Sequence, residues 1–441
     1  MAILHRLDLQ AEISERIAKG HYFCEEDPCK CRQQVLDELK YAIFSHRWDS
    51  DELVFDHFMM LEGPPPSKNK ISVAKKKSIT WAIETLMASE TPPTGTLLDK
   101  LSTIKGETSS GSIGKLLHFR SKSMDKDCKY GWADTVCINK TSSAELDESL
   151  RSMYAWYRDS HVCIVWLSET DHVSQMERDP WFTRGWTLQE LLAPKRVAFY
   201  ARFWAQITKS DSDKLEDKKK LEAEEADEET ENTEAALWPT ISEITGIPLE
   251  DLLDFKPGPF DIGKRLSWAS KRRTTRVEDQ AYCLIGIFNV VLPIAYGEHD
   301  RAFYRLQAEL VQSCNDKSIF GWKEKASQYN SMLAAAPPNF SEVTPPVEDV
   351  QDSDPILSMT NIGLRMPVLL LKIKEPGVPE AWKLPGAESV AIIGKLKGTG
   401  KHLVVVLARE EVDRQYRRLD MLKVKITGVT VPKKPEVIYI K

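Results

Sequence analysis

Short apolar runs alternate with longer amphipathic segments along the first half of the chain. The runs have the length and continuous hydrophobicity of strands whose two faces are both covered in a parallel sheet. They cover residues 41–48, 130–133, 162–167 and 197–201. Strands that alternate with helices form βαβ units with right-handed crossovers. The pattern therefore predicts an α/β domain in which helices flank a parallel sheet.

The expected helices are marked by apolar residues that recur every three or four positions. Ser142 and Glu145 have the spacing of a capping box, which predicts a helix start. The helix that follows presents one apolar face, formed by Leu146, Leu150, Met153, Tyr154 and Tyr157. Thr275 and Glu278 have the same capping spacing, and they predict a strongly apolar helix that ends before Pro293.

The second half of the chain changes character twice. Residues 210–234 are almost entirely charged or polar, which favours a solvated helix or a disordered linker. Beyond a stretch rich in alanine and proline, β-type runs alternate with turns and predict a small, mostly antiparallel β domain. The expected organisation is a helical lead-in (1–37), an α/β domain (38–207), a charged linker (208–236), a helical region (237–325), a second linker (326–350) and a C-terminal β domain (351–441).

Polar side chains follow three of the expected strands. Ser45 and Arg47 lie at the carboxyl end of the first strand, Asp134 follows the second and Ser168 follows the third. The carboxyl ends of parallel strands lie along one edge of a sheet, where open α/β sheets bind their ligands. We therefore expect these residues to gather around a small-molecule site. For His46 alone, a polar loop that leaves the sheet is the preferred interpretation.

The stretch from Trp181 to Pro194 places two tryptophans before a short apolar helix that carries one acid, Glu190. Thr187 and Glu190 again have capping-box spacing, so the helix is expected to start at Leu188. The same helix should open near the edge that carries Ser45, and its positive end can hold an anion. Glu190 is therefore either a helix cap or a reaction centre, and the local pattern alone leaves both open.

Composition excludes several classes of protein. The chain has 441 residues, of which 42% are hydrophobic and 29% charged, as in soluble globular proteins with more than one domain. Its net charge of -6 gives no reason to expect nucleic-acid binding. The charged start has no apolar core of a secretory signal, and the longest apolar run, 281–296, is too short to span a membrane and predicts a buried helix. We expect a cytoplasmic protein without membrane association.

The eight cysteines are mostly scattered, which favours reduced thiols over a disulfide framework. One cluster is a candidate zinc site, formed by His21, Cys24, Cys29 and Cys31. Its spacing matches no standard finger, and the acidic residues between its members favour a solvated turn. Cys137 has no histidine placed to activate it, so a small buried side chain is the better interpretation than a nucleophile.

Three arginines beside the capping spacing of Thr275 and Glu278 have two interpretations: Arg272, Arg273 and Arg276. They are suited to phosphate, but basic residues beside a helix start more often pair with nearby acids. The chain contains no P-loop, no dinucleotide-binding glycine motif, no nucleophile elbow and no zinc-protease motif. Classical hydrolase and kinase chemistries are therefore weak candidates.

Four sequence blocks in fixed order resemble the HET (heterokaryon incompatibility) domain proteins of fungi. YAIFSHRW resembles the opening strand of that family, and WADTVCINKTSSAELDESLRSMYAWYRDSHVCIVWLSE its central block. WFTRGWTLQELLAP and the segment from RRTTRVEDQAYCLIGIF to YRLQAEL resemble the third and following blocks. Together they span residues 41 to about 322. The chain departs from the pattern at Lys317 and Gly321, and the connection over residues 56–128 is longer than the family leads us to expect.

HET domains in turn are similar to TIR domains, which are flavodoxin-like α/β modules. In TIR domains that cleave NAD, a Trp-Cys-x-x-Glu-Leu motif carries the catalytic glutamate. Trp186, Glu190 and Leu191 fall on that motif, and Thr187 replaces its cysteine. The resemblance implies a TIR-like fold and NAD glycohydrolase chemistry with Glu190 as the key acid.

The same resemblance implies roles for other residues. Arg47 or the helix N-terminus would hold the pyrophosphate of NAD, and Trp48 or Trp186 would stack on a base. NAD is then a substrate, and no cofactor is required. At the family level the resemblance implies incompatibility or immune-type cell death, self-association through the HET domain and an unidentified protein trigger. The alternative is a non-catalytic signalling module that recruits another executor of death.

Overall fold

The structure, a computed structural model, describes residues 2–3, 40–48, 52, 54, 112–128, 130–208, 211–224, 237–349, 356–410, 415–426, 431–432 and 434–441. The chain folds into two compact units. The first unit comprises residues 1–182 and 189–255, and the second comprises residues 183–188 and 256–441. The expected helix at the start of the chain and most of the connection over residues 56–128 lie outside the described residues.

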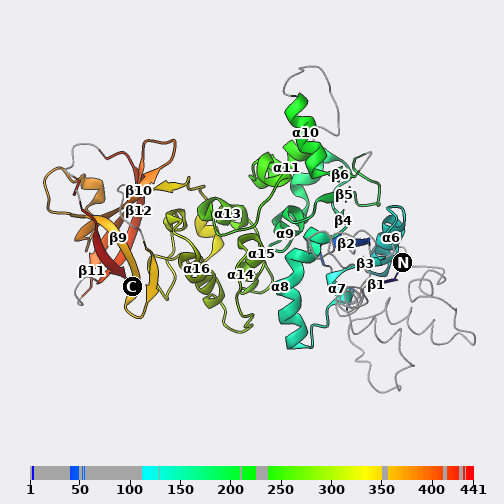
Figure 1. Cartoon of the computed structure of the whole chain (residues 1–441), viewed down its shortest axis with the longest axis horizontal. Helices are drawn as coiled ribbons and strands as arrows, with labels where there is room; N and C mark the ends of the chain where they lie inside the picture. The colour runs from blue at the N-terminus through cyan, green and yellow to red at the C-terminus, as the bar shows by residue number, and fades with distance from the viewer. Residues whose placement is uncertain are drawn as a thin grey trace, which may run out of the picture. The chain divides into compact units, whose positions relative to one another are not determined.

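A six-stranded sheet forms the centre of the first unit (Figure 1). Its strands, in spatial order, are β1 (Ala2–Ile3), β3 (Tyr130–Trp132), β2 (Tyr41–Ser45), β4 (Val162–Trp166), β5 (Arg196–Tyr200) and β6 (Ser212–Asp213). The first five are parallel to their neighbours, and β6 pairs with β5 in the antiparallel sense. The predicted α/β architecture with a parallel sheet is confirmed.

The helices of the first unit fall in the segments between and after the strands. They are α6 (Ser112–Met124), α7 (Asp134–Cys137), α8 (Ser143–Asp159), the 3-10 turns η2 (Val173–Arg178) and η3 (Pro180–Thr183), α9 (Thr187–Leu192), α10 (Lys214–Glu224), α11 (Leu237–Thr245) and α12 (Leu249–Leu253). The last residue of η3 and the first two residues of α9 are counted with the second unit. The predicted start of α8 is confirmed, because the Ser142 hydroxyl accepts a hydrogen bond from the Glu145 amide at 3.3 Å.

The centre of the sheet is dry. All five residues of β2 are buried, and so are the first four residues of β4. Ile43 and Ile164 are both inaccessible to solvent, and burying an isoleucine side chain stabilises a fold by about 1.5–3 kcal/mol. The strand ends that carry the candidate site therefore continue from buried strands.

Short helices make up the first part of the second unit. They are α13 (Ile262–Ala269), α14 (Asp279–Tyr282), α15 (Ile285–Phe288), α16 (Arg301–Ser313), η4 (Lys317–Phe320) and η5 (Pro337–Phe340). α16 buries one apolar face, including Phe303 and Leu306. Among the described residues of both units, no helix combines the length and the apolar character needed to cross a bilayer.

The single long helix predicted after Thr275, and over the apolar run 281–296, is wrong. Two one-turn helices stand in its place, and Asn289 ends the second in a left-handed conformation with φ 52°. The Glu278 carboxylate accepts hydrogen bonds from the backbone amides of Gly297 and His299 instead of capping a helix start. A loop that returns from farther along the chain has thus replaced the local capping contact.

The last part of the second unit is a β-barrel. Its strands are β7 (Val347–Glu348), β8 (Ser358–Thr360), β9 (Gly363–Lys372), β10 (Ser389–Leu396), β11 (His402–Arg409), β12 (Gln415–Val424) and β13 (Glu436–Ile440). The order is β7-β10-β11-β12-β13-β9-β8, and a further pairing between β10 and β9 closes five of the strands into a ring. All of these pairs are antiparallel except β12 with β13, so the predicted mostly antiparallel β domain is confirmed.

Candidate functional site

Glu190 is a buried acid on α9, in contact with the carboxyl end of β2. Its side chain is 7% exposed, and its Oε2 accepts a hydrogen bond of 2.5 Å from the Ser45 hydroxyl. Ser45 is the last residue of β2, and its oxygen accepts a hydrogen bond of 2.8 Å from the indole N–H of Trp181. A continuous chain of hydrogen bonds therefore runs from Trp181 through Ser45 to the carboxylate.

Two further buried groups surround this carboxylate. The Tyr157 hydroxyl donates to the Phe44 carbonyl at 3.1 Å. Burial raises the pKa of Tyr157 well above its ordinary value, and the charge and hydrogen bond of Glu190 raise it further. Burial, followed by the charge of Glu190, also raises the pKa of the Cys163 thiol. Both groups thus stay uncharged at neutral pH.

The expected capping pair, Thr187 and Glu190, has partners on different segments. α9 begins at Thr187, one residue earlier than expected. The Thr187 hydroxyl donates to the Arg184 carbonyl and accepts from the guanidinium of Arg272, both at 2.9 Å within the second unit. The Glu190 carboxylate is held by Ser45 within the first unit. A cap contact alone therefore does not account for the position of Glu190.

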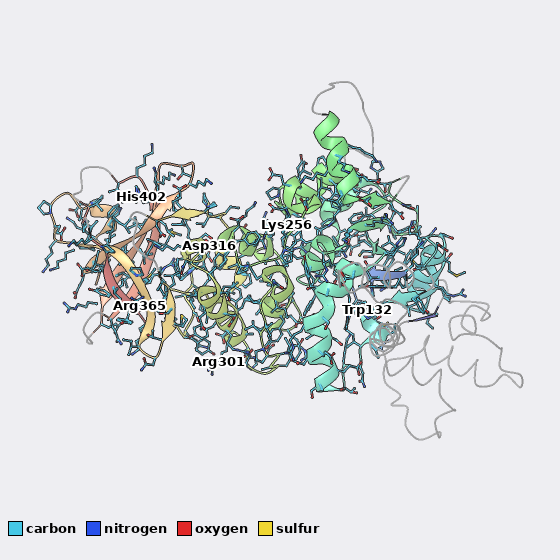
Figure 2. The ribbon with its side chains drawn as sticks, viewed as in Figure 1. Trp132, Lys256, Arg301, Asp316, Arg365 and His402 are labelled. Atoms are coloured by element: carbon cyan, nitrogen blue, oxygen red, sulfur yellow. The ribbon has the colours of Figure 1, made fainter. Side chains whose placement is uncertain are left out.

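Trp48 and Asp134 form a second contact at the same edge of the sheet. The Trp48 indole N–H lies 3.2 and 3.1 Å from the two carboxylate oxygens of Asp134, which follows β3. The Lys140 ammonium lies 3.3 Å from the centroid of the Trp48 ring. One face of Trp48 thus already carries a cation, so a base would have to stack on the other face or displace the lysine. Trp132, at the end of β3, marks this edge in Figure 2.

Arg47 and Ser168 lie close to each other in the fold. The Arg47 guanidinium is 3.8 Å from the carboxylate of Glu169, the residue after Ser168, and both charged side chains are about half exposed. A long, solvated ion pair of this kind contributes little stability. Arg47 is therefore available to exchange Glu169 for an anionic ligand.

Trp186 belongs to the second unit, unlike the other predicted site residues. Asp279 accepts hydrogen bonds from Trp186 and, at 2.8 Å, from the Tyr296 hydroxyl. Burial raises the pKa of Asp279, and these two hydrogen bonds oppose that shift. The Arg276 guanidinium lies 4.2 Å from the centroid of the Tyr296 ring, so this arginine packs against an aromatic side chain.

Lys214 holds the far end of α9. Its ammonium group donates to the carbonyls of Leu191 and Leu192 at 2.6 and 3.2 Å, and the residue is only 3% exposed. Burial lowers the pKa of Lys214 to about 7. The composition of residues 210–234 predicts solvent exposure, so this buried lysine was missed. The hydrogen bond from Ser45 holds α9 at Glu190, and the two from Lys214 hold it at the carbonyls of its last two residues.

The metal and thiol hypotheses have different outcomes. The residues His21, Cys24, Cys29 and Cys31 lie outside the described part of the chain. Within the described part, no group of three histidine, cysteine, aspartate or glutamate side chains is placed to hold a metal. Cys137 is fully buried and its pKa is raised to about 12 by that burial, as expected for a small core side chain.

Three members of the Glu190 cluster were not predicted as site residues: Tyr157, Cys163 and Trp181. Tyr157 and Cys163 lie in apolar patterns that indicate a core, and the core is where they are found. Only the chemistry of their side chains could have indicated that they belong to the site. A tyrosine or tryptophan that is fully buried needs a partner for its O–H or N–H, and the nearest polar groups at this edge were Ser45 and Glu190.

Comparison with known proteins supports the resemblance to HET domain proteins. The sequence profile of the family described as "Heterokaryon incompatibility protein (HET)" matches residues 41–179. A curated relative, "Vegetative incompatibility protein HET-E-1" of Podospora anserina, is 39% identical over 197 residues, and the match covers 41% of this chain and 12% of the relative. The chain therefore spans only a small part of the length of that protein. No solved structure matches the chain.

Proposed function

We propose that this chain is an effector of incompatibility-type cell death whose α/β domain is the active part. The profile match over residues 41–179 and the identity to a vegetative incompatibility protein support this role. The matched region contains Ser45 at the end of β2, Asp134 at the start of α7, Tyr157 on α8 and Ser168 just after β4. In this proposal the domain self-associates when a protein trigger is present, and assembly switches on its activity.

The proposed activity is TIR-like hydrolysis of NAD at Glu190. The bond between the nicotinamide nitrogen and C1′ of the ribose breaks, and its electron pair leaves with nicotinamide. Water adds to C1′ and releases one proton, which gives ADP-ribose. The reaction passes through an oxocarbenium-like state, as in glycoside hydrolysis. A carboxylate fixed beside C1′ stabilises that positive charge electrostatically.

The observation that carries this proposal is the Ser45–Glu190 contact. It holds a carboxylate in a fixed position at the carboxyl ends of parallel strands, where open α/β sheets bind ligands, in surroundings from which water is largely excluded. Interactions with a developing charge are stronger in such surroundings than in water. In the same scheme Arg47 binds the pyrophosphate, and a ribose hydroxyl takes the place of Ser45 as the donor to the Glu190 carboxylate.

The direct test is nicotinamide release from NAD by the purified protein, dilute and concentrated. Glu190→Gln keeps the size of the side chain and removes its charge. We expect activity that rises with protein concentration and falls at least 100-fold in Glu190→Gln, since loss of one preorganised electrostatic group costs roughly 10²–10³ in rate. Glu278→Gln is the matched control, because Glu278 is another buried, hydrogen-bonded carboxylate but lies in the second unit. Full activity of Glu190→Gln would refute the assigned role.

A second candidate is a non-catalytic signalling module, and the burial of Glu190 favours it. Only 7% of this residue is exposed, and its carboxylate is already hydrogen-bonded within the fold. In that case the acid maintains the structure of a self-association surface. Cell death on expression, without nicotinamide release at any protein concentration, would favour this candidate over the first.

A further inference from the structure

A buried cluster of charged side chains lies beside β2, next to the Glu190 site. The His46 Nε2 is 3.0 Å from one carboxylate oxygen of Glu52, and the Lys115 ammonium donates to the other at 3.0 Å. The three side chains are 1%, 5% and 4% exposed. They come from the end of β2, from the segment that follows it and from α6. Burying charged side chains is costly unless they are paired, and here Glu52 contacts both of the other side chains.

This cluster and Glu190 hold the same strand end from opposite faces. The rings of Phe44 and His46 are stacked with their centroids 4.2 Å apart, so these two side chains share a face of the sheet. Phe44 also stacks on Phe119 of α6. Ser45 lies between Phe44 and His46 in sequence and points to the other face, because successive side chains of a strand alternate. There it meets Glu190.

The ring of His46 is held through one of its two nitrogens. Its Nε2 contacts Glu52, and its Nδ1 is buried and has no hydrogen-bond partner among the described residues. The contact with Glu52 therefore sets the orientation of this ring.

We propose that Lys115, Glu52 and His46 form a positioning relay for Glu190. Lys115 holds Glu52, Glu52 holds the His46 ring, and the ring fixes the backbone at the end of β2. That backbone sets the position of the Ser45 hydroxyl, which holds the carboxylate. The relay rests on the proposed catalytic role of Glu190, but its coupling to Ser45 is a property of the fold. Its members act through Ser45, so they are positioning residues.

The coupling to Ser45 is tested without any enzyme assay. The indole N–H of Trp181 donates to Ser45, so its NMR signal reports the position of that hydroxyl. Trp181→Phe assigns the signal in the full-length protein. We expect Lys115→Met to shift this signal and Lys115→Arg to restore it, because arginine keeps the positive charge beside Glu52. Lys317→Met is the matched control, since Lys317 is also a buried lysine paired with an acid, Asp349, in the second unit.

The catalytic part of the proposal is tested by steady-state cleavage of NAD. Lys115→Met should lower kcat roughly 10- to 100-fold with little change in KM, as expected for a displaced catalytic group. Lys115→Arg should recover most of this loss. If Lys115 serves only to stabilise the fold, Lys115→Met will contain a smaller fraction of folded protein. Once that fraction is measured, the kcat calculated per folded molecule will equal that of the wild type.

Each outcome decides a separate claim. A Trp181 signal that stays in place in folded Lys115→Met overturns the relay. If that variant does not fold, Glu52→Asp, which shortens the acid by one methylene, is measured against the same criterion. If the wild-type protein releases no nicotinamide, the proposed function fails, and the Trp181 signal still decides whether the relay reaches Ser45.

Discussion

Lys214 allows a quantitative prediction, because it is a buried cation whose charge the fold disfavours. Its pKa is about 7 in the folded protein, and an unfolded lysine titrates at 10.5. Between these values the unfolded chain binds more protons than the folded one, so this residue makes stability rise with pH. The full cost of burying the charge, about 5 kcal/mol from the difference of the two pKa values, applies below pH 7. It has fallen to about 2 kcal/mol at pH 9.

Lys214→Met removes that cost together with two hydrogen bonds. The bonds are those to the carbonyls of Leu191 and Leu192, and losing them costs about 1 kcal/mol each or somewhat more. The variant should therefore be about 2–3 kcal/mol more stable than wild type at pH 6, and close to equal in stability at pH 9. The quantity to compare is the change with pH, since the lost hydrogen bonds contribute at both values.

Urea unfolding at pH 6 and pH 9 measures this change. The indole N–H signal of Trp238 is a suitable local probe, because the Lys214 ammonium lies 5.5 Å from the centre of that ring and two-state unfolding cannot be assumed for a chain of two units. Lys218→Met is the control, since Lys218 lies on the same helix but is one-third exposed beside Asp254. A stability difference that is the same at both pH values would mean that the Lys214 amine titrates normally, which would refute its burial.

Two further changes test other contacts. Ser45→Ala should destabilise the first unit by about 3 kcal/mol, because it removes buried partners of Trp181 and Glu190 at once; thermal unfolding measures the loss. Ser149→Ala is its control and should be nearly neutral, since that buried hydroxyl has no partner among the described residues. Gly263→Ala should destabilise the second unit by about 1–3 kcal/mol, because the new methyl group would lie 2.7 Å from the carbonyl oxygen of Ser318. An unchanged melting temperature in Gly263→Ala would contradict this close packing.

The sheet was predictable because its signal is local. Each parallel strand is a continuous apolar run, and the run itself contains the information that both faces are covered. The strand ends then follow from topology, which is why Ser45 and Glu190 were expected at one edge although they are far apart in sequence. The direction in which a side chain points at that edge could not be predicted in the same way. It depends on neighbours such as Trp181 and Tyr157, whose patterns indicate only a core.

The errors have a common physical cause. Thr275 and Glu278 have the spacing of a cap, but Glu278 accepts from the amides of Gly297 and His299, which come from a later loop. Lys214 lies in a stretch that is polar on average, but the carbonyls at the end of α9 bind this one residue. In both cases a tertiary hydrogen bond outweighs a local preference of about 1 kcal/mol, and such a partner cannot be read from neighbouring residues.

The closed ring of β-strands also affects how the second unit is made. β13 pairs with β12 on one side and with β9 on the other, and Glu436 lies opposite Val368 across a long separation in sequence. Until residues 436–440 have left the ribosome and docked, β9 and β12 each expose an edge that can pair with another chain. Contacts of such long range also form slowly. During synthesis the barrel therefore exposes unpaired strand edges until β13 has docked between β9 and β12.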